Sequence, residues 1–235
     1  MSKYSEKKSE QSQKVNIKYD VASYLLGIIL VVLAPVAGGI IAPFLDFAGY
    51  GAMRPFFKEL FTSIIWVVIV IIAQIIYLKK LSYNLFCEKG YKSGELPIKR
   101  ILFIGGIVAL CIIIISAQIG FQVKPFYDLG EKFNGYDLFN NLGIFLRNAV
   151  KCVLVVIMLK AATNIIESFN IKNENYIPYA GIVLALTVGI YDLIMGLNNL
   201  SITYFFLYVV YGWIYLLTEK APVKSYLIIL FLFLF

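Results

Sequence analysis

Long apolar runs separated by short polar breaks are the main pattern along the chain. A helix needs about 20 apolar residues to cross the ~30 Å hydrocarbon core of a bilayer. Six runs meet or approach this length, at residues 21–45, 60–78, 101–121, 142–162, 177–197 and 201–217. A seventh run, 223–235, is short for a span unless it is re-entrant or the bilayer thins around it.

The runs are continuously apolar and do not alternate, which favours helices over the strands of a β-barrel. The predicted fold is therefore an all-α, polytopic membrane bundle with six long spans and a short seventh C-terminal segment. In the outer half of the first span, Pro35 and Pro43 flank Gly38 and Gly39 and predict a bent or partly unwound segment. The Gly38–Gly39 and Gly105–Gly106 pairs are expected to let helices approach closely.

The polar segments define the domain organisation. Residues 1–20 contain five lysines and too few apolar residues for a core, so we expect a disordered basic tail. They are also too long and too polar to be the start of a signal peptide. Residues 21–235 are expected to form a single transmembrane domain, because no break between the runs has room for a soluble domain.

Basic residues are distributed unequally between the breaks. Of the 21 Lys and Arg residues, 15 are assigned to one side and four to the alternate breaks. The 15 are those of the tail, those of the break 79–100, and four at or near the ends of the fourth and sixth runs: Lys160, Lys172, Lys220 and Lys224. This positive-inside bias predicts a multi-pass protein of the cell membrane with a cytoplasmic N-terminus. The breaks 46–59, 122–141 and 198–200 would then face outside. The Ile, Lys, Asn and Tyr bias is typical of an AT-rich bacterial genome, so the expected location is a bacterial inner membrane.

Composition agrees with this class. The chain is 60% hydrophobic and 15% charged, with a mean hydropathy of +0.82, against about 45–50% and about 25% in globular proteins. The net charge of +7 comes from the breaks that set topology, so we expect membrane lipid and no nucleic acid as a partner. The chain has no histidine and no CxxC pair, which argues against a metal site, a cofactor and an enzyme.

Three ionisable residues fall inside predicted spans, where charges are costly and indicate function by default: Arg147, Lys151 and Asp192. Arg147 and Lys151 share a face of the fourth span at i, i+4, and Asp192 has a matching depth on the antiparallel fifth. One interpretation is an outer-half pocket of net charge +1 for a small anionic ligand, with Asn148 adding hydrogen bonds. The other is a structural ion pair, with one base reaching toward the interface.

The stretches IPYAGIVLALTVGIYDLI (177–194) and YFFLYVVYGWIYLLTEK (204–220) resemble the later helices of the CPBP membrane proteins, the CAAX-protease and bacteriocin-processing (Abi) family. In that family one late helix ends in an FxxxH-like motif, and an aromatic and glycine pattern follows before a short basic break. If Val188 stands for the aromatic residue, Asp192 stands for the histidine. Catalytic members also use Glu-Glu-x-x-x-Arg, and this chain has no adjacent Glu pair. The resemblance therefore implies a member without peptidase chemistry and with no catalytic residue.

Three functions remain open. The first is a non-catalytic, CPBP-like scaffold or regulator that binds another membrane protein or lipid through its spans, or forms an oligomer. The alternative is the substrate-capturing membrane subunit of a small-solute transporter, suggested by the broken first run and the buried charges. An intramembrane enzyme is less favoured, because the threading places Glu167 and Asp192 on opposite membrane faces.

Overall fold

A computed structural model describes residues 3–41, 43–44, 54–81, 84, 86, 96–118, 135–169, 171, 176–196 and 199–234. In these ranges all regular structure is helical. The long helices are α1 (Lys3–Ile41), α2 (Arg54–Leu81), α3 (Ile98–Gln118) and α5 (Gly135–Ser168). The C-terminal part contains α6 (Tyr179–Leu184), the π-helical turn η3 (Ala185–Gly189), α7 (Ile190–Gly196), α8 (Asn199–Leu217) and α9 (Pro222–Leu234).

Four helical segments are long and apolar enough to cross a membrane, and they match the first four predicted spans. They are Ile17–Ile41, Pro55–Lys79, Ile98–Gln118 and Leu142–Ser168. Three further apolar helical segments, Tyr179–Ile194, Ile202–Leu217 and Pro222–Leu232, are shorter. The predicted class of helical membrane protein is thus confirmed, and the structure supports four spans of the predicted six by length.

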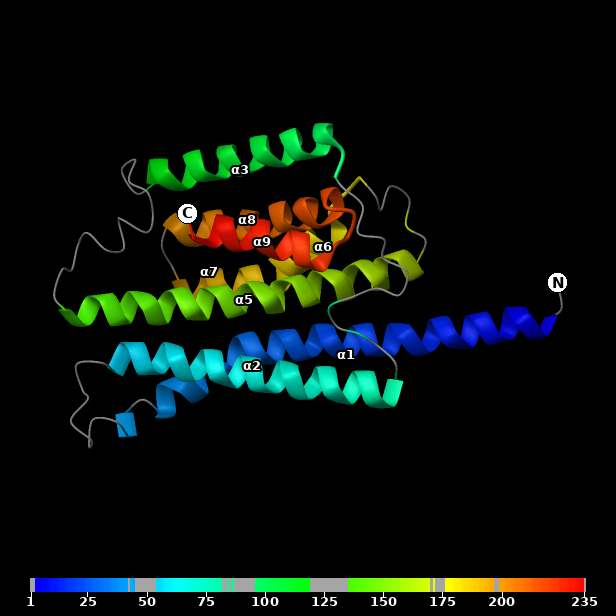
Figure 1. Cartoon of the computed structure of the whole chain (residues 1–235), viewed down its shortest axis with the longest axis horizontal. Coiled ribbons are helices and arrows are strands. Elements are labelled where there is room, and N and C mark those ends of the chain that lie inside the picture. Colours follow the sequence, from blue (N-terminus) through cyan, green and yellow to red (C-terminus); the bar gives the residue numbers. More distant parts are fainter. Residues whose placement is uncertain are drawn as a thin grey trace.

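The helices lie side by side, and the chain reverses direction from each to the next, except that α6, η3 and α7 continue as one segment (Figure 1). Helix α5 runs through the middle, with α1 and α2 on one side and α6, α8 and α9 on the other (Figure 1). The reason lies in its sequence, because the consecutive residues Leu154, Val155, Val156 and Ile157, which point to different sides of the helix, are all buried. A helix that is apolar all round is stable only where neighbours or lipid surround it. Helix α3 lies on the outside, next to α8 (Figure 1).

Close contacts between backbones fix several of these helices. A Cβ added to Gly181 on α6 would lie 2.8 Å from the Cα of Gly212 on α8, so both positions need glycine for this crossing. On the other side of the bundle, the Trp66 indole donates a hydrogen bond of 2.7 Å to the Leu30 carbonyl. This bond joins α2 to α1 through a buried side chain.

The N-terminal segment differs from the sequence prediction. Residues 3–20, expected to be a disordered tail, form the first half of α1. Lys, Glu and Gln are good helix formers, and a helix that already exists in the apolar half extends without a new nucleation step. At its other end α1 continues through Pro35 to Ile41, and Figure 1 shows the last turns bending away from the helix axis. A proline inside a helix produces such a bend.

Candidate functional site

The structure brings two of the predicted site residues into direct contact. The Lys151 ammonium on α5 lies 2.7 Å from the Asp192 carboxylate on α7, and the two side chains are 14% and 22% exposed. Asp192 also accepts a hydrogen bond of 2.5 Å from the hydroxyl of Tyr208, a buried residue of α8. The Lys151 nitrogen lies 6.0 Å from the centre of the Tyr208 ring. Asp192 thus joins three helices through one carboxylate.

Arg147 has a different acid as its partner. Its guanidinium donates to the Glu59 carboxylate on α2 at 3.0 Å, with side chains 34% and 13% exposed. The expectation that both bases gather at Asp192 is therefore wrong for Arg147. Residues four apart on a helix differ by about 40° around its axis. This offset and the long side chains allow Arg147 to face α2 while Lys151 faces α7.

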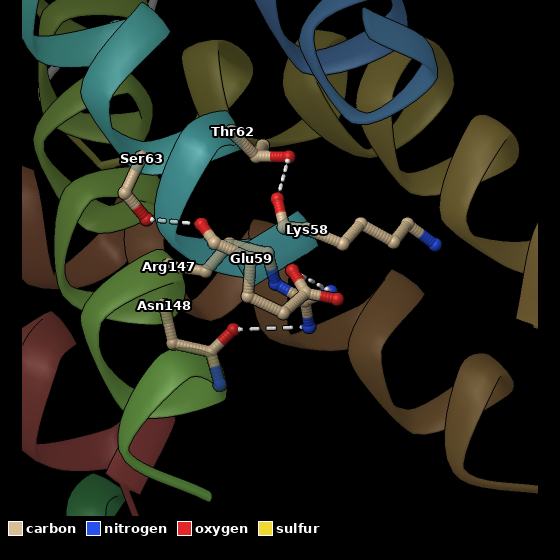
Figure 2. A network of polar contacts seen from close by, with 6 residues as sticks. All are labelled: Lys58, Glu59, Thr62, Ser63, Arg147 and Asn148. Atoms are coloured by element: carbon tan, nitrogen blue, oxygen red, sulfur yellow. Dashed lines mark hydrogen bonds and ion pairs between the residues drawn. The ribbon is translucent and has the colours of Figure 1, made fainter. Parts of the chain in front are cut away.

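Asn148 takes part in the Arg147 group and lies next to it on α5. Its side-chain oxygen is 3.5 Å from the second terminal nitrogen of Arg147 (Figure 2). The sequence prediction gave Asn148 the task of binding a ligand. In the structure its amide oxygen lies beside the guanidinium that holds Glu59, and ligand binding by Asn148 stays a prediction.

Glu59 is the residue that the sequence analysis missed. The second span was predicted to begin at residue 60, which left Glu59 in a loop, whereas α2 begins at Arg54. The sequence did contain a signal for Glu59. It is an acid directly before an apolar run, at about the depth expected for Arg147. With Glu59 included, the formal charges of Glu59, Arg147, Lys151 and Asp192 cancel. The net charge of +1 predicted for this region is thereby corrected to zero.

Two hydroxyls near the start of α2 bond back to carbonyls of the preceding turn, next to Glu59. The hydroxyls of Thr62 and Ser63 donate to the carbonyls of Lys58 and Glu59, each at 2.8 Å (Figure 2). A Cβ at Gly38 of α1 would lie 2.4 Å from the Thr62 hydroxyl, so the predicted close approach at this glycine places α1 directly on α2. Figure 2 shows the Lys58 side chain pointing away from the Glu59–Arg147 pair.

The π-helical turn determines where Asp192 points. A π-turn adds one residue to a helix and rotates the residues after it by about 100° relative to an uninterrupted α-helix. Thr187 in this turn shares a hydrogen bond of 2.8 Å with the Tyr24 hydroxyl of α1 and donates to the Val183 carbonyl at 2.9 Å. Such turns are frequent at functional sites. Here η3 directs the first turn of α7 toward α5.

A second group of polar contacts lies toward the other end of α5. The buried Lys160 ammonium donates to the Asn84 carbonyl at 2.5 Å, and the Asn164 amide donates to buried Asp20 of α1 at 3.0 Å. The sequence analysis counted Lys160 among the residues of a polar break, and the structure places it inside α5. These bonds join α1 and the segment after α2 to the central helix.

Glu167 lies still further along α5 and forms an ion pair with Lys220. It follows Lys151 by sixteen residues of the same helix, a rise of about 24 Å. Glu167 is therefore far from the Lys151–Asp192 pair, as the threading predicted. Within the ranges that the structure describes, no group of three or more Cys, Asp or Glu side chains is placed to hold a metal ion.

The chemical character of the outer site follows from these pairs. In a low-dielectric setting a lone charge is expensive, and a hydrogen-bonded opposite charge removes much of that cost. Both bases have such a partner, and the two pairs connect α2, α5 and α7, while Tyr208 joins α8 to Asp192. Comparison with protein-family models, with curated proteins and with solved structures finds no match. The resemblance to CPBP proteins therefore stays a prediction that depends on residues 177–220.

Proposed function

We propose that this chain is a non-catalytic integral membrane scaffold or regulator, CPBP-like in its last helices, that binds a transmembrane helix of another membrane protein. The observation that carries the proposal is the glycine pair of α3. A Cβ added to Gly105 or Gly106 would meet nothing within 4 Å. At Gly38 and Gly181, by contrast, a Cβ would collide with a neighbouring helix of the same chain.

A glycine inside a helix costs about 1 kcal/mol relative to alanine. That cost is repaid at Gly38 and Gly181, because these residues let two helices of this chain approach. At Gly105 and Gly106 the described part of the chain offers no such contact. In membranes, small residues spaced by four let a second helix approach closely, and Gly105 is followed at this spacing by exposed Ala109.

The rest of the outer face of α3 has the character of a membrane-embedded helix surface. Leu102 and Ile113, one turn or two from the glycines, are 70% and 59% exposed. Lipid tails can cover such side chains, but they gain nothing from a glycine pair. A partner helix gains close backbone contact there, which is the main source of affinity between helices in lipid.

The proposed setting is a bacterial inner membrane with six crossings and a cytoplasmic N-terminus. In this arrangement α6, η3 and α7 together make the fifth crossing and α8 the sixth. Reversal of direction between consecutive helices supports it (Figure 1). The transporter alternative depended on a broken first span and on buried charges. The continuous helix of α1 through Pro35 and the pairing of Arg147 and Lys151 with acids both favour the scaffold.

Site-specific photocrosslinking in native membranes tests the proposal. A photoreactive phenylalanine analogue at Leu102 or Ile113 should give one discrete protein adduct. The same analogue at Val68 or Ile72, exposed positions on α2, is the matched control and should give none. Replacing Gly106 with Leu should abolish the α3 adduct without unfolding the chain, because that space is open. Equal adducts from α2 and α3, or none from α3, would overturn the proposal.

A further inference from the structure

An open pocket lies at the opposite end of the bundle from the Glu59–Arg147 pair. Arg100 from the first turn of α3, Leu216 from the end of α8, and Glu219 and Lys220 from the turn after α8 line this pocket of about 280 Å³. Ligand pockets span roughly 300–1,000 Å³, so this one has room for a headgroup and not for a whole lipid. Two of the four lining residues, Arg100 and Lys220, are basic, and neither takes part in the proposed contact with a partner helix.

The turn that closes this pocket has an unusual backbone. Glu219 and Lys220 have φ angles of 60° and 59°, the left-handed region that residues with side chains rarely adopt. The turn is held from both sides, since the Lys220 amide donates to the Tyr215 carbonyl at 2.9 Å and the Thr218 and Ser225 hydroxyls are 2.6 Å apart. Left-handed residues and a bond of this kind close many helix ends, so the turn fixes Glu219 and Lys220 in place at the end of α8.

The charged side chains of the pocket can accept an outside anion at little cost. Arg100 lies 2.6 Å from Glu219, but the two side chains are 44% and 40% exposed, and such surface pairs contribute little. An anion can therefore replace Glu219 on the guanidinium, whose fork of donors matches two phosphate oxygens. Lys220, held near the pocket by Glu167, has three ammonium hydrogens and can donate to the same anion.

The surroundings decide between a dissolved anion and a lipid. Ile98 on α3 and Val223 on α9 are strongly exposed apolar side chains within three residues of the pocket lining. Trp213, half-exposed on α8, precedes Leu216 by one turn, and tryptophan is enriched at membrane–water interfaces. Acyl chains cover such surface, whereas a free phosphate ion does not. A basic pocket between membrane helices is a recognised form of anionic headgroup site.

We infer that this pocket binds the headgroup of one anionic phospholipid, with its phosphate on Arg100 and Lys220 and its acyl chains against Ile98 and Val223. The site depends on the membrane setting and is independent of the partner helix proposed for Gly105 and Gly106. Because the lipid pocket and the partner-helix contact use different residues, an experiment can refute one proposal and leave the other standing.

Lipid binding to the purified full-length chain tests the inference, measured by native mass spectrometry with added phosphatidylglycerol or phosphatidylcholine. Wild type should bind one phosphatidylglycerol about tenfold more tightly than phosphatidylcholine. The double variant Arg100→Gln/Lys220→Gln should lose this preference. The matched control Lys18→Gln/Lys79→Gln removes two exposed lysines of α1 and α2 and should keep it. No preference in wild type, or equal loss in the control, would refute the site.

A second variant is expected to strengthen lipid binding. It keeps the test valid if the double variant does not fold. Glu219→Gln removes the acid that competes for Arg100, so phosphatidylglycerol should bind more tightly than to wild type. Unchanged or weaker binding would contradict the inference. Glycerol 3-phosphate serves as the soluble probe, and it should not displace the lipid at equal concentration. If it does, the pocket is a site for a free phosphate compound and the lipid assignment is wrong.

Discussion

Arg147 and Glu59 are joined at 3.0 Å across α5 and α2, although 88 positions separate them in the sequence. Lys151, one turn further along α5, is joined to Asp192 on α7. These four charges thus form two separate pairs, each linking α5 to a different neighbour. If the pairs are separate, a substitution in one pair should leave the stabilisation by the other pair unchanged, which would not hold for a single shared cluster.

Double-mutant cycles should show coupling within each pair and none between the pairs. Asp192→Asn or Lys151→Gln alone should lower the free energy of unfolding by about 1–3 kcal/mol, because each leaves a half-buried charge without its partner. The double variant should lose less unfolding free energy than the two single variants lose in sum. Asp192→Asn combined with Arg147→Gln should instead be additive within about 0.5 kcal/mol. SDS-induced unfolding in mixed micelles measures these values.

The control for this prediction is the cycle Arg147→Gln with Glu59→Gln, which should show coupling of the same sign as Lys151 with Asp192. Strong coupling between Arg147 and Asp192 would mean that the two bases share one acid. That result would restore the pocket of net positive charge expected from the sequence.

Tyr208→Phe should destabilise the bundle through Asp192 and not through packing. The substitution keeps the ring and removes the hydroxyl that donates to the carboxylate at 2.5 Å. Hydrogen bonds to charged groups contribute about 1.5–3 kcal/mol. The loss should shrink in an Asp192→Asn background, where the acceptor is neutral. An equal loss in both backgrounds would show that the hydroxyl acts elsewhere.

The sequence predicted the helical class, the first four spans and the Lys151–Asp192 contact because these depend on long apolar runs and on helix depth. It could not assign Arg147 to Glu59, since that choice depends on where α2 begins and on a small angular offset around α5. Hydropathy gave no sign of η3, because a π-turn changes the register of a helix and not its apolar character. Lys160 was misplaced for a related reason: a single lysine inside a long helix and a lysine in a break look alike in the sequence.

The glycines offer a matched pair of substitutions with opposite expected effects. Gly212→Ala should destabilise the chain by about 1–3 kcal/mol, the usual cost of overpacking, because its Cβ would lie 2.7 Å from the Gly181 backbone. Gly106→Ala should stabilise it by about 0.5–1 kcal/mol, since the space is open and alanine favours the helix. Thermal unfolding of both variants in one detergent makes the comparison direct. Destabilisation by Gly106→Ala would show that another segment of the chain packs against α3.

Deletion of Leu186 tests whether the π-turn positions Asp192. Leu186 lies in η3 and is exposed, so its removal can close the turn to an α-helix without emptying the core. Residues beyond it would then rotate by about 100° relative to those before it. With α6 fixed against α8 at Gly181, Asp192 would turn away from Lys151, and the coupling energy between them should fall to about zero. Leu186→Ala, which keeps the residue count, should retain the coupling. If the deletion also retains it, the neighbouring helices and not the extra residue set the direction of the carboxylate.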